Sequence, residues 1–66
     1  MAEVVNLITL EVGVKVFTTA GATIEIIENP KDGVWIFGKY TINPNDPSLV
    51  GTEEMFFAQD ITEVLH

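Results

Sequence analysis

The sequence contains no cysteine and only one histidine, His66, among its 66 residues. Without cysteine no disulfide can cross-link the chain, and zinc sites built from several Cys or His ligands are excluded. A domain of this size buries only about 60% of the surface that its unfolded chain exposes. Such domains usually depend on disulfides, metals or oligomerisation. Oligomerisation is therefore the expected supplement, and the hydrophobic content of 47% agrees, because so small a domain has little interior.

Basic side chains are also scarce. The chain has three lysines and no arginine against ten acidic residues, so its net charge is −7. Proteins that bind nucleic acids neutralise phosphates with Lys and Arg, so we expect no nucleic-acid partner. Anionic membranes are disfavoured for the same reason. A protein with basic residues, a cation or a neutral partner is compatible with this charge, which also favours solubility.

Long hydrophobic runs are missing as well. No apolar stretch approaches the ~18 residues of a membrane-spanning helix. The N-terminal segment MAEVVNLITL has no basic residues and carries Glu3, unlike a signal peptide. We therefore expect a soluble cytoplasmic protein with its native start, folded as a single domain over residues 1–66.

The residues that are present form short β-rich runs separated by turn signals. Strands are predicted over residues 14–19, 23–28, 34–42, 53–59 and 62–65. Gly21 and Gly33 suit turn positions with positive φ, and Gly38 in mid-strand indicates a bulge or a sharp bend. Asp60 is expected to cap a short turn. Residues 1–9 are compatible with a short helix, an extra strand or an extended arm.

One segment resembles a known class of small barrels. Residues 10–16, LEVGVKV, are similar to the LxxGxxV start of many SH3-like barrels of the KOW and Tudor type, and residues 19–24, TAGATI, resemble their first turn. The resemblance covers about residues 10–65 and implies that a short turn at 59–61 precedes a last strand paired with the first. The chain lacks the basic surface of the nucleic-acid-binding members of this class. The expected fold is all-β: a single SH3-like barrel of about five strands with one long acidic hairpin loop.

That loop, residues 43–54, reads NPNDPSLVGTEE and invites comparison with a calcium site. An EF-hand loop needs an oxygen ligand at position 5 and glycine at position 6. Counting from Asn43 places Pro47 and Ser48 there, so the EF-hand is excluded. The favoured interpretation is a proline-stiffened hairpin loop. The alternative is an irregular cation site that uses Asp46, Glu53 and Glu54.

Catalytic groups are not apparent. A catalytic His66 would need a fixed partner, but it is the last residue, where order is least expected. Glu53 and Glu54 are adjacent in a predicted strand and point to opposite faces, so they cannot share a proton. The five glycines are dispersed rather than gathered in a phosphate-binding loop. We expect neither an enzyme nor a cofactor.

The aromatic residues suggest an interaction surface. In the strand over 34–42 one face carries Val34, Ile36, Tyr40 and Ile42. Trp35 and Phe37 occupy the other face, which cannot also line the core. Phe56 and Phe57 likewise point in opposite directions. The predicted surface consists of Trp35, Phe37, Phe56 and Phe57.

An uncovered apolar patch of this kind marks a site of interaction. A second copy of the chain, a different protein, the N-terminal arm or the long loop would cover it. A Tudor-like cage for an alkylated cation would use the same rings. The favoured function is a non-enzymatic, self-associating protein-interaction module, such as a homodimer. The alternatives are a small-ligand or cation-binding domain that uses loop 46–54, and a non-catalytic accessory subunit of a larger complex.

Overall fold

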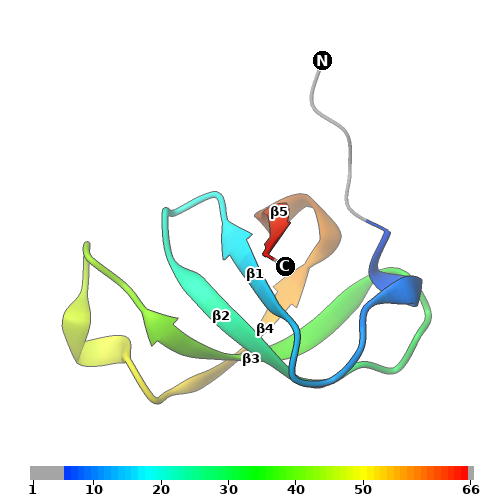
Figure 1. Cartoon of the computed structure of the whole chain (residues 1–66), viewed down its shortest axis with the longest axis horizontal. Coiled ribbons are helices and arrows are strands. Elements are labelled where there is room, and N and C mark those ends of the chain that lie inside the picture. The colour runs from blue at the N-terminus through cyan, green and yellow to red at the C-terminus, as the bar shows by residue number, and fades with distance from the viewer. Residues whose placement is uncertain (1–5, 66) are drawn as a thin grey trace.

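The computed structural model describes residues 6–65, which form one all-β sheet of five antiparallel strands (Figure 1). The strands are β1 Lys15–Thr18, β2 Thr23–Glu28, β3 Trp35–Ile42, β4 Glu53–Phe57 and β5 Ile61–Leu65. Residues 6–65 also form three single-turn 3₁₀ helices: η1 Leu7–Thr9 precedes β1, η2 Pro47–Leu49 lies between β3 and β4, and η3 Ala58–Asp60 lies between β4 and β5. Within residues 6–65, no helix has the length and apolar character needed to cross a membrane.

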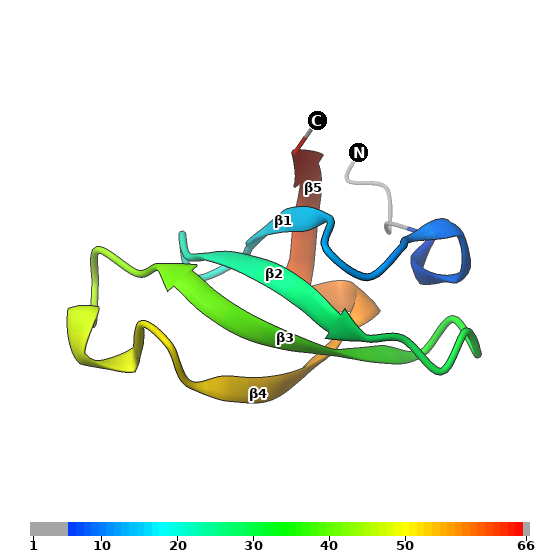
Figure 2. The ribbon, with the colours of Figure 1, turned by 60° about the horizontal axis from the view of Figure 1, so that its bottom comes forward.

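The strand order is β4-β3-β2-β1-β5. The first four strands form a meander, and β5 returns to pair with β1, where Val16 lies opposite Val64. This confirms the pairing of the last strand with the first that the SH3-like resemblance implies. Figure 2 shows how strongly the sheet is bent, because β5 runs steeply across the direction of β3 and β4. In the described part of the chain β4 and β5 are the two edges, so closure into a barrel stays a prediction.

The end of β4 differs from the prediction. The strand stops at Phe57 and residues 58–60 turn as η3. The Asp60 carboxylate accepts a hydrogen bond from the backbone N–H of Phe57 at 3.2 Å, which confirms that Asp60 caps a short turn. The turn redirects the chain from β4 into β5.

Two bulges bend the β2–β3 pair. Ile26 lies opposite Gly38 and Glu28 opposite Phe37, so Ile27 is an extra residue in β2. Thr41 is the extra residue in β3, between the partners of Ile24 and Thr23. The bend predicted at Gly38 therefore arises beside it, on the neighbouring strand. Bulges increase the local twist and help the small sheet to wrap around its core.

The core lies on the concave side of the sheet. Its buried members are Leu7, Leu10, Val16, Ile24, Ile26, Ile36, Phe56 and Ile61. The prediction that Val34 and Ile42 share the inner face is wrong, because they are 53% and 60% exposed. Val34 precedes β3, and the extra residue Thr41 reverses the alternation before Ile42, which lies opposite Thr23.

The N-terminal segment is a turn that supplies core residues. Leu7 is fully buried within η1 and Leu10 follows it at 6% exposure. The Asn6 side chain accepts a hydrogen bond from the N–H of Ile8 at 3.1 Å, which caps the turn. Of the ambiguous residues 1–9, the part from Asn6 onward is thus neither a strand nor a free arm, and residues 1–5 and His66 lie outside the described residues.

Candidate functional site

The pairing of β3 with β4 gathers four large side chains on the outer face of the sheet, the face turned away from the core. Trp35 lies directly opposite Phe57, and Phe37 directly opposite Met55. Residues opposed in this way share a face and are close enough to pack. The rings of Trp35 and Phe37 meet edge to face, with their centroids 5.3 Å apart. We call these four residues the outer apolar patch.

Solvent reaches this patch. Met55 is 42% and Phe57 39% exposed, while Trp35 and Phe37 are half-buried. The long loop does not cover it, since the side-chain amide of Asn45 donates to the carbonyl of Ala20 at 2.7 Å and holds the loop on the β1–β2 turn. The long loop therefore leaves the patch exposed, and residues 1–5 of the N-terminal arm, the other cover expected from the sequence, lie outside the described residues.

Phe56 does not belong to this surface, which corrects the sequence prediction. It lies opposite Ile36 on the inner face, is 5% exposed and is a member of the core. Its ring packs edge to face on Tyr40, with centroids 5.4 Å apart. Met55 takes its place, and strand alternation from Phe57 was the signal that could have identified it.

The three acidic candidates for a cation site are separated. Glu53 lies opposite Lys39 on the outer face, whereas Glu54 lies on the other side of β4, where it is exposed and its carboxylate accepts from the Tyr40 hydroxyl at 2.7 Å. Asp46 lies in the hairpin loop, where it accepts from the Ser48 hydroxyl. Within residues 6–65, no cluster of three or more His, Cys, Asp or Glu is placed to hold a metal ion. The geometry gives the cation-binding alternative no support.

The loop matches a proline-stiffened hairpin. It contains η2, which begins at Pro47, and the Asn43 side chain accepts from the backbone N–H of Asp46 at 3.1 Å. The Asn45 bond to Ala20 adds a contact to the β1–β2 turn. The amides of Asn43 and Asn45 and the carboxylate of Asp46 therefore shape the loop itself.

The pKa of Tyr40 is shifted from its ordinary value. Burial raises the pKa of Tyr40 to about 12, helped by the hydrogen bond to Glu54 and by the negative charges of Glu54, Asp46 and Asp60. Each of these effects disfavours the phenolate, which would be negative and partly desolvated. The Tyr40–Glu54 contact therefore joins β3 to β4 only while the hydroxyl keeps its proton.

This contact predicts a pH dependence of stability. The pKa of Tyr40 in the folded state, about 12, lies above the ordinary 10.0, so its contribution is complete below pH 10 and is lost as pH rises toward 12. Replacing Tyr40 by Phe should cost about 1 kcal/mol at neutral pH, and this difference should shrink in that window. Urea unfolding of both proteins at stepped pH values measures this difference in unfolding free energy. The lysines titrate in both proteins, so their effect cancels from the difference. A difference that stays constant to pH 12 contradicts the assignment.

Comparison with known proteins matches the chain to no protein-family model, no curated protein and no solved structure. Function is therefore inferred from the outer apolar patch. Its side chains present indole, phenyl and thioether groups. Such groups bind a partner by burying apolar surface, and they do not transfer protons or chemical groups. A surface of this composition suits a protein partner, since aromatic residues and Met are enriched in interfaces.

Proposed function

We propose that this chain is a non-enzymatic protein-interaction module that associates with itself through the outer apolar patch. The observation that carries the proposal is the exposure of Met55 and Phe57 beside Trp35 and Phe37 on one face of two adjacent strands. The expectation that the protein works in the cytoplasm belongs to the same proposal.

The small size of the domain supports self-association. A sheet of five short strands encloses few side chains, so apolar residues remain outside it. Covering Met55, Phe57 and the exposed edges of Trp35 and Phe37 would stabilise the fold and remove an aggregation liability at the same time. A second copy supplies such a cover without any other component.

Replacing Phe57 by Ser is expected to weaken self-association by about tenfold or more, because it removes an exposed aromatic side chain of the outer apolar patch while its position outside the core spares the fold. Sedimentation equilibrium over a concentration series measures the dimer constant. Trp35 is the only tryptophan, so a shift of its emission to shorter wavelength with rising concentration reports burial of the patch itself.

Val50→Ser is the matched control. Val50 is 48% exposed but lies in the β3–β4 loop, so its loss should leave both the dimer constant and the Trp35 emission unchanged. A wild-type protein that stays monomeric at its highest soluble concentration, with constant Trp35 emission, would overturn the proposal.

A further inference from the structure

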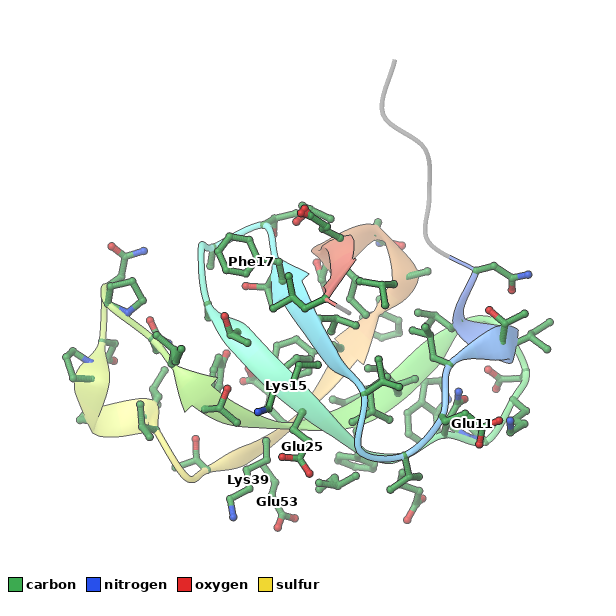
Figure 3. All side chains as sticks on the ribbon, viewed as in Figure 1. Glu11, Lys15, Phe17, Glu25, Lys39 and Glu53 are labelled. Atoms are coloured by element: carbon green, nitrogen blue, oxygen red, sulfur yellow. The ribbon has the colours of Figure 1, made fainter. Side chains whose placement is uncertain are left out.

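A row of alternating charges crosses the outer face next to the outer apolar patch. Lys15 of β1 lies opposite Glu25 of β2, Glu25 lies opposite Lys39 of β3, and Lys39 lies opposite Glu53 of β4. Figure 3 shows these four side chains lying side by side across the sheet. We call them the charged row. It spans four neighbouring strands and contains two of the three lysines.

Apolar side chains border this row on both sides. Phe37 and Met55 lie two residues from Lys39 and Glu53, so alternation places them on the same face. On the other side Phe17, 40% exposed, follows Lys15 by two residues. The charged row thus lies between apolar surfaces rather than in a wholly polar region.

The order of signs in the charged row is self-complementary. Read from β4 to β1, the signs are minus, plus, minus, plus. A second copy turned by a two-fold axis parallel to the strands presents the reversed order, so each charge meets its opposite. A two-fold axis across the strands would instead place Glu53 against Glu53. Isologous dimers use such two-fold, self-complementary surfaces.

We propose that two copies of this chain pack outer face to outer face about an axis that runs between β2 and β3. Glu53 then meets the partner's Lys15, and Lys39 meets the partner's Glu25. This inference rests on the proposed function and adds to it the orientation of the two copies. Because this axis keeps each residue at its height along the strands, the outer apolar patch on β3 and β4 of each copy is covered by the end of the partner's β1 and β2 and not by the partner's patch. The charged row selects the register, since complementary charges give specificity more than affinity.

Charge complementarity favours a second copy over a basic partner. A uniformly basic surface would meet a lysine at two of the four positions of the row. The charged row has no net charge although the chain carries −7, so only an alternating partner fits it. The chain itself carries that alternating pattern at the required strand spacing.

Charge reversal at Lys15 and Glu53 tests this arrangement, because the two residues meet only between copies. Within one sheet they lie on β1 and β4, with β2 and β3 between them. By symmetry, Lys15→Glu alone creates two like-charge contacts in a dimer, and so does Glu53→Lys. Each single variant should raise the dimer Kd by roughly 100-fold.

An equimolar mixture of the two single variants should recover the dimer, as a heterodimer in which both contacts again join opposite charges. The double variant Lys15→Glu/Glu53→Lys should recover the homodimer, although each new side chain then has a like-charged neighbour, Glu25 or Lys39, in its own sheet. If Lys15 and Glu53 acted only within their own sheet, the double variant would associate no better than the single variants. Both substitutions place like charges on neighbouring strands of that sheet. Thermal unfolding of each variant confirms that it is folded.

The outcomes separate the two proposals. If the wild type associates but the mixture does not recover the dimer, or the single variants associate as the wild type does, this orientation is wrong while self-association stands. If the wild type is monomeric under all conditions, both proposals fail. Association of the mixed variants with a Kd near that of the wild type supports the orientation.

Discussion

Replacing Gly38 by Ala is expected to lower the free energy of unfolding by roughly 1 to 3 kcal/mol, the usual cost of inserting a methyl group into a packed core. A Cβ at this position would lie 2.6 Å from the Cδ1 of Ile24 and 3.2 Å from two ring carbons of Phe56. Ile24 is fully buried and Phe56 is 5% exposed, so either side chain makes room only by displacing its neighbours in a close-packed core.

Whether Gly38→Ala lowers or raises the free energy of unfolding shows how tightly this position is packed. The φ of Gly38 is not in the left-handed region, so Ala would otherwise be tolerated there and would stabilise the protein by restricting the unfolded chain. The predicted loss therefore reports the close approach of Ile24 and Phe56 to the backbone of β3. Chemical denaturation of the two proteins measures the difference directly.

Ile24→Val provides the matched test because it removes the Cδ1 atom that the methyl group introduced by Gly38→Ala would meet. Alone it should cost about 1 kcal/mol. Combined with Gly38→Ala, the total should fall clearly below the sum of the two single effects, since residues in contact are not additive. Strictly additive losses would show that the clash with Ile24 does not cause the destabilisation.

The strands were predictable because their signals are local. β2, for example, occupies the whole predicted run from Thr23 to Glu28, where β-branched and alternating residues coincide between two turn segments. Gly21 and Gly33 have positive φ as predicted, and the angle is 82° at both residues. Such features depend on a few neighbouring residues and are visible in one sequence.

Features that depend on register were not predictable in the same way. The bulge residues Ile27 and Thr41 have ordinary strand side chains, and their position follows from how β2 and β3 meet. Thr41 reverses the alternation, which is why Ile42 turns outward against the prediction. Gly38 is recognisable in the sequence as a special position, but its reason, the packing of Ile24 and Phe56, requires three strands to be in place.

The candidate site shows the same division. Alternation within one strand is enough to assign Trp35 and Phe37 to the outer face. Alternation from Phe57 likewise places Met55 on the outer face of β4, but only the register of β3 and β4 sets it opposite Phe37. The charged row goes further, because its members come from four separate strands, and no local pattern in the sequence brings them together.

Asn29 is the second position where a large loss of stability is expected. Its side-chain amide donates to the carbonyls of Leu7 and Leu10 at 2.7 and 2.8 Å, and its side-chain oxygen accepts from the N–H of Lys31 at 2.8 Å. One side chain thus holds the N-terminal turn, which supplies two core leucines, against the β2–β3 connection. Asn29→Ala should cost about 2 kcal/mol, because the Leu10 carbonyl loses its donor in a partly buried site.

Asn29→Asp separates the donor role from shape. At neutral pH its carboxylate would face two carbonyl oxygens, so this nearly isosteric variant should be less stable than Asn29→Ala. That repulsion raises the pKa of the new carboxyl in the folded state, so its stability is greatest below the ordinary value of about 3.9 and falls as pH rises. Denaturation of both variants from pH 7 downward should therefore show the aspartate variant recovering relative to alanine. Equal losses at every pH would mean that the amide does not act as the donor that holds the turn.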